Sequence, residues 1–125
     1  MNKVLNVVVL SGGVSPEREV SKESSYAIYN TLKNAGHNVK LIDPGYGINQ
    51  PESDELFFKP DFKDLKPEEF YNVFELKEFS EADIVFNGLH GGWGEDGHVQ
   101  ALLDVKKIKY TSEIVKNLNI FLCNK

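Results

Sequence analysis

Apolar residues in this chain form short, nearly continuous runs that alternate with longer amphipathic stretches. The runs at residues 4–10, 39–42 and 84–89 are rich in β-branched side chains, which is typical of parallel strands covered on both faces. Helical spacing follows the first and third of these runs. The alternation predicts an α/β domain: a three-layer open parallel sheet with helices on both faces.

The longest amphipathic stretch follows the first strand and predicts its first helix. Ser15 is expected to be the N-cap with Pro16 at the first helical position, and Gly36 is expected to end the helix. Lys22 and Glu23 are expected to lie in solvent. The side chains expected on the buried face are Val20, Ser24, Ala27, Ile28, Leu32 and Ala35.

The second half of the chain predicts further elements with a less regular pattern. Residues 56–58 and 70–76 are aromatic-rich, and we expect them to form a small antiparallel pair. A helix is expected over 98–107, with Val99, Leu102 and Leu103 on its buried face. A short strand over 108–111 and a helix over 114–122 complete the expected order of elements.

Composition narrows the classes of function. The 125 residues suit one domain, and the net charge of −5 without a basic stripe argues against nucleic acid as a partner. No apolar run approaches the roughly 18 residues that span a bilayer, so no membrane contact is expected. The single cysteine, Cys123, favours a reducing, cytoplasmic compartment. The three histidines and this cysteine lack metal-ligand spacing, so no metal site is expected in this chain.

Two glycine-rich turns follow predicted strands and mark the candidate site. They are residues 11–19 (SGGVSPERE) and 90–97 (HGGWGEDG). In open α/β sheets ligands bind beyond the carboxyl ends of the strands, and glycine allows the backbone to approach a ligand closely. Two such turns predict one shared site.

The chemistry of these turns leaves alternatives open. Neither carries a nucleotide phosphate fingerprint. Glu17 can bind a cationic group such as a substrate ammonium, or it can simply complement the helix dipole. His90 can contact a carboxylate or an oxyanion, or hydrogen-bond backbone in a tight turn. Glu95 and Asp96 are interpreted as structural residues that cap the next helix or brace the glycine turn.

The two turns together resemble the amino-terminal domain of the D-alanine–D-alanine ligase family. Residues 10–21 (LSGGVSPEREVS) are similar to the family signature G-G-x-S-x-E-x-E-V-S. Residues 86–97 (FNGLHGGWGEDG) are similar to its signature L-H-G-x-x-G-E-D-G. Residues 99–103 and 109–111 continue the likeness.

The resemblance implies a Rossmann-like domain of pre-ATP-grasp type. It also implies an ATP-grasp ligase of peptidoglycan synthesis that joins two D-alanines through a D-alanyl phosphate. It implies that Glu17 holds the ammonium of the first D-alanine and that Val20 and Ser21 belong to this substrate-binding subsite. Ser21 is also expected to support the helix start. His90 would lie near the first substrate and the acyl phosphate, which makes Glu17 and His90 the catalytic candidates. Lys125 matches a phosphate-binding lysine of the family. ATP, Mg (or Mn) and a homodimer are the further partners implied.

Two departures from the family pattern qualify this interpretation. Residues 112–119 (SEIVKNLN) are bulkier than the glycine–serine–glycine turn of the family, and the chain stops at Lys125. We therefore expect 1–125 to be a single amino-terminal domain, inactive alone, with ATP and metal bound mainly by absent central and carboxy-terminal domains. The alternatives are a stand-alone, non-enzymatic module that binds a small molecule or a protein, and a flavodoxin-like nucleotide-binding domain.

Overall fold

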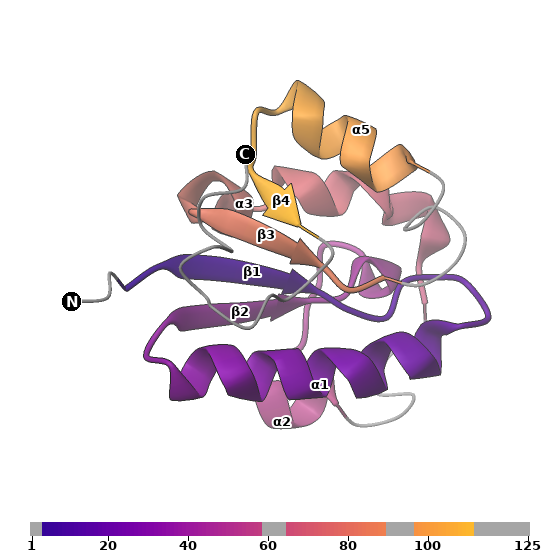
Figure 1. Ribbon diagram of the computed structural model, residues 1–125. Coiled ribbons are helices and arrows are strands. Elements are labelled where there is room, and N and C mark those ends of the chain that lie inside the picture. Colours follow the sequence, from indigo (N-terminus) through magenta and orange to yellow (C-terminus); the bar gives the residue numbers. More distant parts are fainter. Residues whose placement is uncertain (1–3, 59–64, 90–96, 112–125) are drawn as a thin grey trace.

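The computed structural model describes residues 4–58, 65–89 and 97–111. In this part of the chain four parallel strands form one sheet in the order β2-β1-β3-β4 (Figure 1). The strands are β1 (Asn6–Leu10), β2 (Asn38–Ile42), β3 (Ile84–Asn87) and β4 (Tyr110–Thr111). The parallel sheet confirms the predicted α/β class.

Helices cover both faces of the sheet and make three layers. The α-helices are α1 (Arg18–Asn34), α2 (Asp54–Phe57), α3 (Lys77–Glu81) and α5 (His98–Val105). The short 3-10 helices are η1 (Pro44–Tyr46), η2 (Pro67–Glu69) and η3 (Tyr71–Glu75). Figure 1 shows α1 and α2 below the sheet and α3 and α5 above it.

The central strand β1 is buried on both faces because its side chains alternate between two apolar clusters. Val7 and Val9 pack with Leu32 of α1 and Phe57 of α2. On the opposite face, the core side chains are Val8, Leu10, Ile42, Phe70, Val73, Phe74, Phe79, Val85, Leu89, Val99 and Leu103. Continuous apolar runs are therefore the correct signal for these strands.

The register of the sheet brings three strand ends to one line. Leu10 at the end of β1 pairs with Ile42 of β2 on one side and with Asn87 of β3 on the other. The Ser11 amide then donates to the carbonyl of Ile42 (3.0 Å), and the Gly88 amide donates to the carbonyl of Leu10 (2.9 Å). The loops that follow these three strands start side by side.

Helix α1 differs from its prediction in its start and in its buried face. The helix begins at Arg18 with Glu17 in the N-cap position, and Ser15 instead accepts the Glu17 amide in the preceding turn (3.1 Å). Gly36, with φ +95°, ends the helix as expected. The buried side chains are Ser21, Lys22, Ser25, Tyr29 and Leu32. The predicted face was wrong at every position but Leu32 and the partly buried Ile28.

The aromatic residues between β2 and β3 form helical turns, so the predicted antiparallel pair at 56–58 and 70–76 was wrong. Leu56 and Phe57 lie in α2, and residues 71–75 form η3. Helix α2 is tied to α1 because the hydroxyl of Tyr29 donates to Asp54. Burial, together with this hydrogen bond, raises the pKa of Tyr29 to about 12.

The carboxy-terminal elements agree with the predicted pattern as far as the structure describes them. Val99 and Leu103 of α5 are buried, Leu102 is partly buried, and β4 pairs with β3. The helix expected over 114–122 lies outside the described residues. Within the described residues, no helix is long and apolar enough to cross a membrane.

Replacing Leu103 with alanine should lower the free energy of unfolding by about 2–5 kcal/mol, because it leaves a cavity in the core above the sheet. Val105 ends the same helix and is 78% exposed, so Val105→Ala is the matched control and should change this energy by at most about 0.5 kcal/mol. Urea unfolding measures both. Equal effects would contradict the assignment of the buried face of α5.

Candidate functional site

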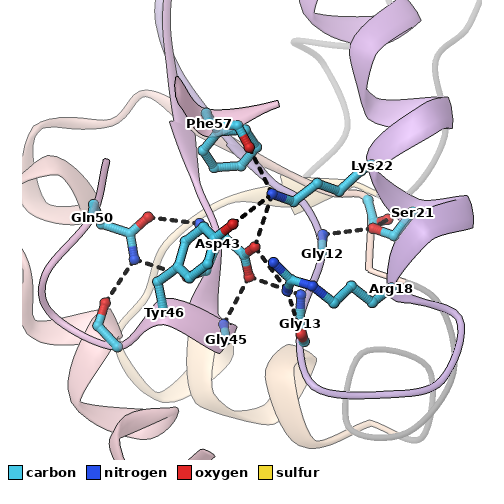
Figure 2. Close-up of polar contacts among 12 residues, drawn as sticks. Gly12, Gly13, Arg18, Ser21, Lys22, Asp43, Gly45, Tyr46, Gln50 and Phe57 are labelled. Atoms are coloured by element: carbon cyan, nitrogen blue, oxygen red, sulfur yellow. Dashed lines mark hydrogen bonds and ion pairs between the residues drawn. The ribbon is translucent and has the colours of Figure 1, made fainter. Parts of the chain in front are cut away.

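The candidate site lies where the first glycine-rich turn leaves β1 and enters α1. This turn starts beside the residues that follow β2 and β3, because the three strand ends are aligned. Figure 2 shows the side chains that converge beneath it from α1 and from the segment after β2. The arrangement is the carboxyl-edge position at which open α/β sheets bind ligands.

Asp43, the first residue after β2, is the centre of this arrangement and is fully buried. Its Oδ1 accepts hydrogen bonds from the amides of Gly13 (2.9 Å) and Gly45 (2.8 Å). Its Oδ2 pairs with the guanidinium of Arg18 at 2.9 Å. Arg18 also donates to the carbonyl of Gly13 (2.8 Å). Both the amide and the carbonyl of Gly13 are therefore hydrogen-bonded by this pair of side chains.

Gly12 is required because the turn runs directly over this carboxylate. A Cβ atom at position 12 would lie 2.4 Å from Oδ2 of Asp43. The residue also has φ +93°, a left-handed conformation that glycine adopts without steric cost. The glycine pair therefore serves a buried carboxylate within the chain itself, where the sequence alone indicates only a turn.

Ser21 joins the first turn to Gly88, which follows β3 and precedes the second turn. Its hydroxyl accepts the amide of Gly12 (2.8 Å) and donates to the carbonyl of Gly88 (2.6 Å). Ser21 is fully buried, so this bridge is not shared with solvent. One side chain on α1 thus holds the first turn beside the residues that lead into the second.

Glu17 and Val20 are on the exposed side of the same region. Glu17 is exposed at the N-cap position of α1, and its side chain makes no capping hydrogen bond. Val20 is 55% exposed and lines an open groove of about 590 Å³ along α1 together with Tyr26 and Phe58. Both side chains are accessible to a ligand at the edge of the sheet.

The remaining predicted site residues lie outside the described residues. These are His90, Glu95 and Asp96 in the second turn and Lys125 at the end of the chain. The structure describes the entry to the second turn through Leu89, whose amide donates to the Asn87 side chain (3.2 Å). His90 therefore follows a residue packed beside the first turn, where a Cβ on Gly13 would lie 3.3 Å from Leu89.

Three charged residues of the site framework were missed by the sequence analysis: Arg18, Lys22 and Asp43. Lys22 was expected in solvent, but it is buried and its Nζ lies 3.4 Å from Oδ2 of Asp43. A signal for the group exists, since Arg18 and Lys22 are four residues apart on one helix face and Asp43 directly follows a buried strand.

The pKa of the Lys22 ammonium group responds most strongly to burial. Burial lowers the pKa of the Lys22 ammonium, with Arg18 acting in the same direction, whereas the Asp43 carboxylate acts in the opposite direction. The rings of Phe57 and Tyr46 lie 4.5 and 4.8 Å from Nζ and supply further favourable contacts for a cation. The group contains two cations and one anion.

Comparison with known proteins identifies the family. The family model described as D-ala D-ala ligase N-terminus matches residues 6–113. The chain belongs to this family. The resemblance predicted from the two glycine-rich turns is therefore confirmed. The match favours the ligase interpretation over a flavodoxin-like domain.

Relatives of this ligase domain are longer proteins. The D-alanine--D-alanine ligase of Pediococcus pentosaceus is 36% identical over 86% of this chain and 37% of its own length. That of Fervidobacterium nodosum is 37% identical over 93% of this chain and 30% of its own length. The chain thus spans about a third of the length of the curated relatives that it matches.

A solved structure shows the same fold. The D-alanine--D-alanine ligase from Bacillus anthracis, complexed with ATP, matches 88% of this chain and 28% of that chain, with a TM-score of 0.58 and 21% sequence identity. The α/β arrangement of this domain is therefore shared with part of a longer ligase chain.

Replacing Gly12 with alanine should lower the free energy of unfolding by about 2–5 kcal/mol, because the strain of a positive φ adds to a clash with Asp43. Gly36→Ala is the matched control. It shares the positive φ but meets nothing within 4 Å, so about 1–2 kcal/mol is expected. Urea unfolding compares the two variants, and an equal loss would show that Asp43 does not constrain the turn.

Proposed function

We propose that this chain is the amino-terminal domain of an ATP-dependent D-alanine–D-alanine ligase and binds the first D-alanine. Membership of the family supports the proposal. The observation that carries it is the buried framework of Asp43 and Ser21, which holds the Gly12–Gly13 turn and leaves Glu17 exposed at the sheet edge. A site of this kind offers an accessible carboxylate on a hydrogen-bonded support.

Glu17 is the residue that we assign to the substrate ammonium. Its carboxylate lies at the amino end of the 17-residue helix α1, where the helix dipole favours negative charge. An amino acid bound there through an ion pair has its own carboxylate free to react. Holding the amino acid in place removes much of the entropic cost of bringing the reactants together.

His90 is assigned to the reacting end of the same substrate. In the proposed reaction the D-alanine carboxylate attacks the terminal phosphorus of ATP, so that D-alanyl phosphate forms and ADP leaves. The amine of a second D-alanine then attacks the acyl carbon and displaces phosphate. A histidine beside the first substrate can donate a hydrogen bond to the negative charge that develops on the acyl group.

The remaining two thirds of the full-length product are proposed to hold most of the ATP and the metal. No three His, Cys, Asp or Glu side chains among the described residues form a group that could hold a metal ion. Magnesium or manganese, bound elsewhere, would neutralise charge on the phosphates. Lys125 is the one phosphate contact that we assign to this chain. A cytoplasmic homodimer that supplies peptidoglycan precursors is the setting we propose.

The proposal predicts that the full-length product releases ADP with D-alanine and not with L-alanine. Glu17→Gln removes the charge that pairs with the ammonium, so KM for D-alanine should rise about 10- to 100-fold. Coupled ADP-release assays measure both quantities. Glu81→Gln is the matched control, because Glu81 is exposed at the end of α3. Its carbonyl accepts a hydrogen bond from Asn6 at the start of β1, so Glu81 lies at the amino ends of the strands, away from the candidate site. ADP release that is indifferent to D-alanine would contradict the proposal.

A further inference from the structure

Lys22 is a buried cation that the proposed reaction does not use. It lies on α1 directly after Ser21, and its side chain points inward toward Asp43, Tyr46 and Phe57 (Figure 2). The ammonium group donates to the carbonyl of Phe57 (2.7 Å) and to the hydroxyl of Tyr46 (3.2 Å), and it pairs with Asp43 at 3.4 Å. A lysine ammonium carries three N–H donors, so these three acceptors match its capacity.

Packing alone does not explain why a charged lysine occupies position 22. Burying an ammonium is costly unless it is paired and hydrogen-bonded, and an apolar side chain of similar volume often serves stability as well as a buried ion pair does. Asp43 already has a closer cation, Arg18, at 2.9 Å. Neutralising Asp43 is therefore not sufficient to account for Lys22.

Lys22 differs from Arg18 in what else it holds. Arg18 binds the carbonyl of Gly13, within the turn itself. Lys22 binds the carbonyl of Phe57 at the end of α2, which is 35 residues away in sequence. Through its Nζ atom, Lys22 thus connects α1 to the end of α2 and to Asp43 and Tyr46 in the segment after β2.

The contacts of two adjacent residues then hold the turn from two sides. Ser21 binds the amide of Gly12 directly. Lys22 holds Asp43, whose other oxygen binds the amide of Gly13. Glu17 follows Gly13 by four residues, and in between the chain is held by the Ser15 hydroxyl. The position of the Glu17 backbone therefore depends on the position of the Asp43 carboxylate.

We propose that Lys22 is a positioning residue of the first D-alanine site, which acts by fixing the Asp43 carboxylate beneath the Gly12–Gly13 turn and thereby the placement of Glu17. This inference rests on the proposed function. It concerns how well the substrate is bound, because Lys22 is buried and its ammonium contacts Asp43, Tyr46 and Phe57 of the chain itself. Its loss should weaken D-alanine binding while the chemical step is preserved.

The test is the steady-state kinetics of the full-length product with Lys22→Met and Lys22→Arg. Lys22→Met should raise KM for D-alanine about tenfold while kcat stays near the wild-type value, because a hydrogen-bonded charge that orients the site is lost. Lys22→Arg retains the charge and should restore most of the affinity. Lys33→Met is the matched control, since Lys33 is exposed on the same helix, and its KM should be unchanged.

The outcomes separate this inference from the proposed function. A folded Lys22→Met variant with wild-type KM, or one with a lowered kcat and unchanged KM, would overturn the inference. If Lys22→Met does not unfold cooperatively in urea, Lys22→Gln replaces it with the same expected rise in KM. A wild-type product without D-alanine-dependent ADP release would contradict the proposed function instead. The amide NMR signal of Gly13 in the 125-residue chain tests the positioning of the turn without substrate: it should shift in Lys22→Met and not in Lys33→Met. An unchanged Gly13 signal in Lys22→Met would overturn the inference.

Discussion

A buried carboxylate directly after strand β2 is the constraint on which the site depends. Burying the charge of Asp43 is unfavourable unless hydrogen bonds and counter-ions compensate it, and the chain supplies two amides and two cations for this purpose. The backbone must come very close to make these contacts. A Cβ on Gly45 would lie 2.5 Å from the carbonyl oxygen of Gly13, so glycine is needed on both sides of the carboxylate.

The parallel register of the strands places the loops that form the site next to one another. Because Leu10 is level with Ile42 and Asn87, the loops after three strands begin at one edge, and polar side chains from α1 reach all of them. Ser21 bonds to the loops after β1 and β3, while Asp43 extends from the end of β2. The framework is rigid and internal, which leaves the exposed Glu17 free to face a ligand. Binding residues carried on loops above a rigid scaffold are a common arrangement.

The sequence predicts the sheet well because a strand that is covered on both faces carries a continuous apolar run. The approximate extent of helix α1 was predicted, but its buried face was not. That face carries Ser21, Lys22 and Ser25. Apolar periodicity cannot detect polar side chains that are buried because they form hydrogen bonds. The aromatic turns of η3 were mistaken for a strand because Phe74 packs against the sheet from a 3-10 helix. The roles of Glu17, Val20, Ser21 and His90 as substrate ligands remain predictions that come from motif resemblance.

The measurement that tests this account most directly is a crystal structure of the full-length product with ATP and a non-reactive D-alanine analogue. The account predicts that the analogue's ammonium lies within hydrogen-bonding distance of the Glu17 carboxylate, with Asp43 still bound to the amide of Gly13 beneath it. An ammonium held by a different carboxylate, or a Gly12–Gly13 turn that leaves Asp43 when the analogue binds, would contradict the claim that a fixed turn presents Glu17 to the substrate.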